Sequence, residues 1–130
     1  MTNTPRVLIV MPAQWPRALI RAALRDAGYD ALGARDLNEA LSYPAVEDDR
    51  GPVGLIILDQ EAMQAPEDSK ASQLMGQHPE ARTLVLESAF RPSTQGSWEH
   101  VLRHPVTITD IVAKTQQLLP LPAPAVHPID

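Results

Sequence analysis

The sequence of 130 residues contains no cysteine, which excludes a disulfide framework, a thiolate metal site and a cysteine nucleophile. Aromatic residues are also scarce, with one Phe, two Tyr and two Trp, so the core should be mainly aliphatic. No apolar run approaches the roughly 20 residues that a membrane-spanning helix needs, and residues 1–5 are too polar for a signal peptide. We therefore expect a soluble cytoplasmic domain with no membrane partner.

Basic residues are in the minority: eleven Lys and Arg stand against sixteen Asp and Glu, for a formal net charge of -5 at pH 7. They are scattered along the chain and form no run. Surfaces that bind nucleic acid normally carry a basic patch or stripe. We therefore expect no nucleic-acid partner.

The length and the 44% hydrophobic content fit one domain with a single core. We assign this domain to residues 1–119. Residues 120–130 carry four of the thirteen prolines and favour an extended conformation that cannot continue a helix. This tail is a frayed terminus or a spacer toward an output domain, and a ligand for a proline-recognition domain is the less favoured alternative.

Apolar segments alternate with amphipathic ones along the chain. Strands are expected at residues 6–11, 29–34, 54–59, 82–86 and 98–103. Helices are expected at about 16–27 and 36–43, around 71–78 and from 107 to 119, whereas residues 90–97 have poor helical character. Such alternation is typical of a parallel sheet covered by helices on both faces.

The first helix should bury an apolar stripe that consists of Leu19, Ile20, Ala23, Leu24 and Ala27. We interpret its three arginines, Arg17, Arg21 and Arg25, as a solvated face. Residues 44–52 are expected to form a solvated loop, and a charged loop is a better interpretation of Asp48 and Asp49 than a metal site.

The apolar run 54–58 is followed by one carboxylate, Asp59, and predicts a strand buried on both faces. Asp59 would lie at the carboxyl end of this strand, where open parallel sheets form their ligand crevices.

Several segments resemble the receiver domain of two-component response regulators, over residues 6–119. The similar segments are Val7-Leu8-Ile9-Val10, Leu24 to Tyr29, Glu39-Ala40-Leu41, Leu55-Ile56-Ile57-Leu58-Asp59, Leu84 to Ala89 and Val101 to Val106. The resemblance implies a flavodoxin-like doubly wound sheet of five parallel strands in the order 2-1-3-4-5, with helix four short or irregular. It also implies phosphoryl transfer from a histidine kinase to Asp59, and often a cis bond before Pro105.

The resemblance places the family's functional positions on particular residues. Asp59 and Ser88 match the phosphoacceptor and the hydroxyl residue after strand four. The acidic pair that holds Mg²⁺ falls on Met11 and Pro12, which supply no side-chain ligand. The lysine position is His104, and the switch aromatic of strand five is Val101.

These departures matter because phosphoryl transfer depends on positioning and on neutralising charge. Without the acidic pair and the lysine, Asp59 lacks the metal and the positive charge that the reaction needs. Glu61 could offer a substitute carboxylate, although a surface loop residue is the simpler interpretation. We expect no cofactor, with Mg²⁺ required only if the phosphoacceptor hypothesis holds.

The leading hypothesis is a degenerate receiver, not an enzyme, that binds a protein partner in signalling without phosphorylation. Its interaction face would be formed by helix four, strand five and helix five, and it could also form a homodimer. The alternative is a working phosphoacceptor in a phosphorelay, phosphorylated on Asp59. A flavodoxin-like enzyme or nucleotide binder is less favoured, because no glycine-rich loop follows the first strand.

Overall fold

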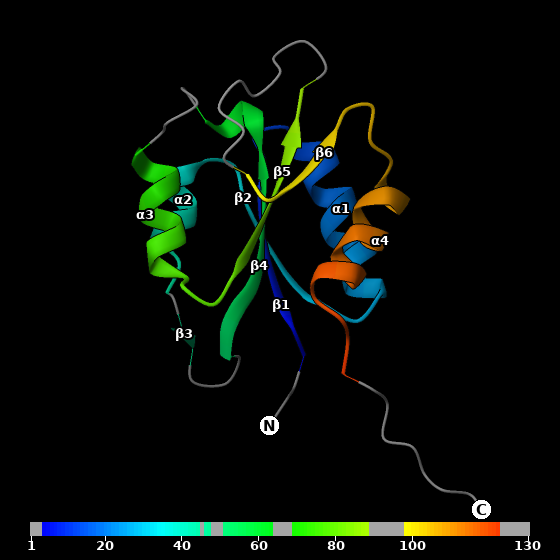
Figure 1. The fold of residues 1–130 in the computed structure, drawn as a ribbon, viewed down its shortest axis with the longest axis horizontal. Coiled ribbons are helices and arrows are strands. Elements are labelled where there is room, and N and C mark those ends of the chain that lie inside the picture. The colour runs from blue at the N-terminus through cyan, green and yellow to red at the C-terminus, as the bar shows by residue number, and fades with distance from the viewer. Residues whose placement is uncertain (1–3, 45, 48–50, 64–68, 89–97, 123–130) are drawn as a thin grey trace, which may run out of the picture.

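The structure is a computed structural model that describes residues 4–44, 46–47, 51–63, 69–88 and 98–122. Parallel strands form the centre of the molecule, and helices cover both faces of the sheet (Figure 1). The strands are β1 (Arg6–Val10), β2 (Asp30–Ala34), β3 (Val46–Glu47), β4 (Gly51–Asp59), β5 (Arg82–Glu87) and β6 (His100–Arg103). The helices are α1 (Gln14–Asp26), α2 (Leu37–Ser42), the 3-10 turn η1 (Gln60–Ala62), α3 (Ser69–Gln77) and α4 (Ile108–Leu118).

The five parallel strands follow the order β2-β1-β4-β5-β6. In chain order, without the short β3, this is the 2-1-3-4-5 arrangement expected from the sequence. The expected irregular helix four falls on residues 90–97, which lie outside the described residues. Among the helices that are described, none has the length and the apolar character to cross a bilayer.

Side chains from β1 and β4 alternate between the two faces of the sheet, and this alternation divides the core in two. Val7, Ile9, Leu55 and Ile57 pack on the face covered by α1 and α4. The intervening residues, including Leu8 and Ile56, pack on the face covered by α2 and α3. Because both faces are covered, these strands are continuous apolar runs, as the sequence predicted.

The central strand is longer than predicted, because β4 begins at Gly51. Its pairing with β1 shifts between Arg6, opposite Val53, and Val7, opposite Leu55, so Gly54 is an extra residue. A Cβ atom on Gly54 would lie 2.8 Å from the Cδ1 atom of Leu119. Glycine at this bulge therefore leaves room for the end of α4 to pack.

Two expectations about the loop after α2 and the core face of α1 are wrong. Residues 44–52 are not entirely a loop, because β3 pairs in antiparallel fashion with the start of β4. Leu19 is not buried: its exposed fraction is 53%, whereas Ile20 and Leu24 face the core. On a helix of this length, the sheet contacts a narrower stripe than the apolar composition suggested.

Local capping contacts and a glycine mark the ends of two helices. The Thr107 hydroxyl accepts from the Asp110 N–H, and the Asp110 carboxylate accepts from the Thr107 N–H, which is a complete capping box. Gly28 has a φ of 108° just after α1, a conformation that glycine adopts without strain. The Thr107 cap ends the loop that follows β6, whereas Gly28 begins the turn into β2.

Candidate functional site

The carboxyl ends of β4, β5 and β6 bring three residues singled out in the sequence to one edge of the sheet. Asp59 is paired in register with Leu86, and Glu87 is paired with Arg103. Ser88 and His104 directly follow Glu87 and Arg103, and the His104 N–H donates to the Glu87 carbonyl at 2.8 Å. The structure therefore places Asp59, Ser88 and His104 on adjacent strand ends.

The Asp59 carboxylate forms a hydrogen bond within its own loop. Its Oδ1 atom accepts from the Glu61 N–H at 2.8 Å, which caps η1. Only 8% of the residue is exposed. Burial raises the pKa of Asp59, and the Glu61 hydrogen bond and the charge of His104 partly oppose this rise. Asp59 is thus a largely buried cap whose ionised form is held mainly by one amide.

Gln60 was not identified from the sequence, although it connects two loops of the site. This buried side chain accepts, through Oε1, from the Ser88 N–H at 2.8 Å. The loops after β4 and β5 are therefore joined by a neutral hydrogen bond between residues 28 positions apart. A polar residue directly after a buried strand was the only signal in the sequence.

An ion pair joins the ends of β5 and β6. The Arg103 Nε and NH2 atoms both donate to Glu87 Oε1, at 3.0 and 2.7 Å. The Glu87 side chain is 4% exposed, whereas that of Arg103 is 63% exposed. The sequence placed both residues at strand ends, but their pairing depends on the parallel register between the strands.

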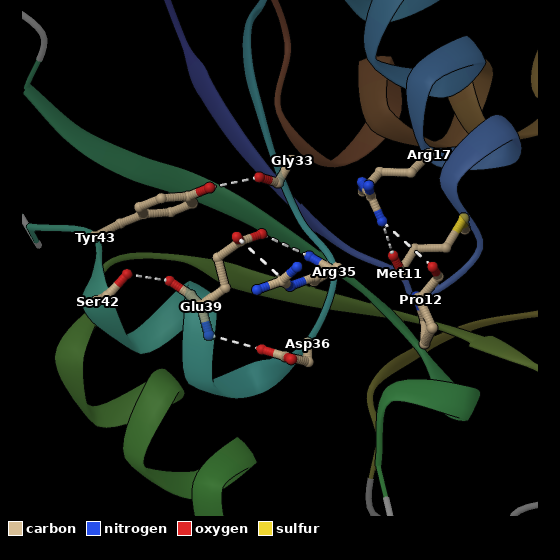
Figure 2. Close-up of polar contacts among 9 residues, drawn as sticks. All are labelled: Met11, Pro12, Arg17, Gly33, Arg35, Asp36, Glu39, Ser42 and Tyr43. Carbon is tan, nitrogen blue, oxygen red and sulfur yellow. Dashed lines mark hydrogen bonds and ion pairs between the residues drawn. The ribbon is translucent and has the colours of Figure 1, made fainter.

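A cation lies at the end of β1. Met11 is buried and Pro12 is exposed. The Arg17 NH1 atom donates to the main-chain oxygens of Met11, at 2.7 Å, and of Pro12, at 3.4 Å (Figure 2). The interpretation of Arg17 as part of a solvated face is therefore wrong, because its guanidinium is directed at the strand end.

The same correction applies to Arg21 but not to Arg25. The Arg21 Nε atom donates to the Ala31 carbonyl of β2 at 3.0 Å, and the residue is half-buried. Arg25 is exposed, as predicted. Positions 17 and 21 are one turn apart on the side of α1 that meets β2, which is why they share this environment.

The remaining candidate positions lie nearer the surface. Glu61 is exposed and lies two residues after Asp59, whose carboxylate accepts from the Glu61 amide. Val101 is 38% exposed on β6, whereas Trp98 packs partly buried against the α2/α3 side of the core. The His104–Pro105 bond is cis, as the family resemblance implied. Within the described parts of the chain, no group of three or more His, Asp or Glu is arranged to hold a metal ion.

The sequence matches no protein-family model and none of the curated proteins compared with it. Solved structures do match. The match to a response regulator from Thermotoga maritima has a TM-score of 0.69 at 17% identity, and it covers 88% of this chain and 97% of the regulator's chain. The match to the Vibrio cholerae chemotaxis protein CheY4 has a TM-score of 0.70 at 23% identity, and it covers 90% of this chain and 100% of CheY4.

A third similar structure is the signal receiver domain of an HD domain-containing protein from Pseudomonas fluorescens Pf-5. Its TM-score is 0.71 at 19% identity, and the match covers 90% of this chain and 95% of the other. By description, these structures are a response regulator, a CheY chemotaxis protein and a signal receiver domain, and each match covers 88% or 90% of this chain. The chain therefore has the flavodoxin-like fold of CheY-type receiver domains.

Proposed function

We propose that this receiver-like domain binds a protein partner in signal transduction without being phosphorylated. The observation that supports the proposal is the arrangement at the ends of β1 and β4. Asp59 is buried and caps Glu61, while the position of the family's acidic pair holds the Met11 side chain and the Pro12 ring. The Arg17 guanidinium, which is a cation, donates to the Met11 carbonyl at the end of β1.

This donor set does not fit Mg²⁺. Magnesium takes oxygen ligands in near-octahedral geometry, from one or two carboxylates together with phosphate and water. A thioether and a proline ring provide no such ligand, and a guanidinium at the same strand end repels a cation. Asp59 and Glu61 are the carboxylates at the end of β4, and Glu87 is engaged by Arg103.

The neutral link between Gln60 and Ser88 supports the same proposal. In this structure the Ser88 amide is already bound by a buried side chain from the neighbouring loop. A buried hydrogen bond is costly to break without a replacement. Ser88, directly after β5, is thus held by a contact that involves no phosphoryl group.

The alternative function, a phosphoacceptor phosphorylated on Asp59 by a histidine kinase, is favoured by a different observation. Asp59 lies at the end of β4, with the charge of His104 near enough to lower its pKa. A protonated His104 could provide part of the positive charge that the transfer needs. In that function, Glu61 would have to act as the substitute metal ligand.

Nuclear magnetic resonance distinguishes the two functions. The amide signals of Glu61 and Ser88 are followed while Mg²⁺ and then beryllofluoride or acetyl phosphate are added, with Asp59→Asn as the control. We expect no saturable change. Saturable shifts in the natural chain that Asp59→Asn abolishes would show a working phosphoacceptor and overturn the proposal.

The partner surface is proposed to include β6 and α4, the counterparts of the family's strand five and helix five. Val101 exposes an apolar side chain on β6, and α4 is the next element of the chain after this strand (Figure 1). An affinity capture should recover the same partner with the natural chain and with Asp59→Asn, but not with Val101→Asp. Ser72→Asp, at an exposed position of α3 on the other side of the sheet, is the matched control. Capture that requires an intact Asp59 would contradict the proposal.

Self-association is tested separately by sedimentation at increasing concentration. A homodimer that uses this surface should dissociate in Val101→Asp and persist in Ser72→Asp. A dimer that both variants retain would place the self-contact elsewhere.

A further inference from the structure

A pocket of about 480 Å³ lies at the outer edge of β2, away from the carboxyl ends of β4 to β6. Residues of α1 form one wall of this pocket. The opposite wall is formed by Leu32 and Gly33 of β2 and by Tyr43, which follows α2. Its volume is in the range of pockets that hold small molecules, roughly 300–1,000 Å³.

Two cations line the pocket. Arg17 and Arg21 are four positions apart, so their side chains leave α1 on the same side. Each guanidinium is positioned by a main-chain carbonyl: Arg17 NH1 donates to Met11 at 2.7 Å, and Arg21 Nε donates to Ala31 at 3.0 Å. The carbonyls orient both groups but do not neutralise their charge.

The charge of both arginines is uncompensated by any ion pair among the described residues. No carboxylate lines the pocket. The closest acidic group along α2, Glu39, accepts from the Arg35 N–H at 2.8 Å and lies 3.9 Å from the Arg35 guanidinium (Figure 2). A guanidinium carries five N–H donors, so most of the donors of Arg17 and Arg21 remain available.

Tyr43 completes the pocket with an aromatic wall. Its hydroxyl donates to the Gly33 carbonyl at 2.6 Å, which fixes the ring against the edge of β2 (Figure 2). Burial, and then Glu39, raise the pKa of Tyr43, whereas the charges of Arg21 and Arg17 lower it. Both cations are thus near enough to act on a group at this position. Leu32 and Ala18 add apolar surface.

We propose that this pocket binds a small organic phosphate, with the phosphate between Arg17 and Arg21 and the organic part against Tyr43 and Leu32. Two guanidiniums match the two charges of a phosphomonoester, and each can donate two parallel hydrogen bonds to its oxygens. A carboxylate carries a single charge and would leave one cation unmatched. The pocket does not include Asp59, although Arg17 also lies at the end of β1, and the proposal holds whether or not Asp59 is phosphorylated.

The proposal is tested by titrating the full chain with phenyl phosphate and following the Nε–Hε signals of Arg17 and Arg21 and the amide of Gly33. Inorganic phosphate and benzoate serve as comparison ligands. We expect saturable shifts with phenyl phosphate, weaker binding of inorganic phosphate, and the weakest binding of benzoate. Because the chain carries a net charge of -5, general attraction of anions cannot produce this order.

Ala18→Glu places a carboxylate within the pocket at an exposed helical position, where glutamate favours the helix. Ala22→Glu adds the same charge one turn further along α1 and outside this pocket. We expect the first variant to weaken phenyl phosphate binding about tenfold or more, and the second to change it less than about threefold. Arg21→Gln should weaken binding by about as much as Ala18→Glu, while circular dichroism checks that every variant is folded.

Three results would overturn the proposal. The first is a linear response that does not saturate. The second is equal loss of affinity in Ala18→Glu and Ala22→Glu, because a long-range charge effect would then explain it. The third is binding of benzoate at least as tight as that of phenyl phosphate, which would identify a carboxylate site instead.

Discussion

The Gln60 side chain accepts a hydrogen bond from the main-chain N–H of Ser88, 2.8 Å away on the neighbouring loop. Gln60 is buried, so Gln60→Leu removes the acceptor at a position that water reaches poorly. We expect a loss of about 1–3 kcal/mol in the free energy of unfolding, measured by urea denaturation. Hydrogen exchange at the Ser88 amide should become faster.

The matched control for this change is Gln116→Leu, at an exposed position of α4. It should alter the free energy of unfolding by less than about 0.5 kcal/mol. Equal effects of the two substitutions would mean that the link between the loops does not stabilise the fold.

Asp59→Asn should stabilise the protein at pH 7. Burial raises the pKa of Asp59, so the folded state binds its proton more tightly than the unfolded chain does. The free energy of unfolding therefore falls as the pH rises through this titration. Asparagine keeps an oxygen that can accept from the Glu61 N–H but carries no charge.

The stabilisation by Asp59→Asn should shrink as the pH approaches the ordinary carboxyl value of 3.8, because Asp59 is then increasingly protonated in the natural chain. Thermal unfolding of both proteins between pH 4 and 8 measures this difference. A variant that is less stable than the natural chain at pH 7 would show that the charge of Asp59 supports the fold.

Arg103→Gln should destabilise the chain, because the buried Glu87 carboxylate loses two hydrogen bonds from one guanidinium. We expect a loss of about 1–2 kcal/mol, which is moderated because the Arg103 side chain is 63% exposed. Adding Glu87→Gln should recover part of it, since no buried charge then remains unpaired. The double-mutant cycle in urea gives the coupling directly, and Arg82→Gln, exposed on β5, is the control.

We expect the protein to lose stability in mild acid because His78 is buried. His78 lies at the end of α3, and neither of its ring nitrogens has a hydrogen-bond partner among the described residues. Burial, and then the charge of Arg6, lower its pKa from 6.5. Below pH 6.5, His78 is protonated in the unfolded chain but remains largely neutral in the folded state. The free energy of unfolding therefore decreases as the pH is lowered, by at most about 1.4 kcal/mol per pH unit.

His78→Leu should reduce this dependence below the ordinary histidine pKa of 6.5, while His100→Gln, on the partly accessible β6, should preserve it. Urea denaturation at several pH values tests both variants. An unchanged slope in His78→Leu would assign the acid sensitivity to other groups.

The strand order and the helix caps could be predicted because they depend on local patterns. The apolar run before Asp59 and the Thr107–Asp110 cap each lie within a few residues. The contacts of Arg17, Arg21 and Gln60 could not be predicted, because each joins a side chain to a main-chain group of another element. These contacts depend on how α1 lies against β2 and on how the residues directly after β4 and β5 meet. The apolar periodicity of the sequence carries no information about either arrangement.

The spacing of Leu19 fits the apolar stripe of α1, but its side chain is exposed. At about 100° per residue, Leu19 points well away from the direction of Ile20 and Leu24, which face the core. Arg17 and Arg21 lie on the opposite flank of the helix, where their long stems cover β2. Composition alone could not indicate which flank of the stripe would meet the sheet.

The contacts along β2 also affect how this chain can associate with others. β2 is an edge strand, and the carbonyls of Ala31 and Gly33 already accept from Arg21 and Tyr43. An exposed strand edge is a template on which another chain can add a strand, and such addition leads to aggregation. A strand arriving at β2 would have to displace a guanidinium and a phenol from these carbonyls. Arg21 and Tyr43 therefore protect the sheet from growing at this edge.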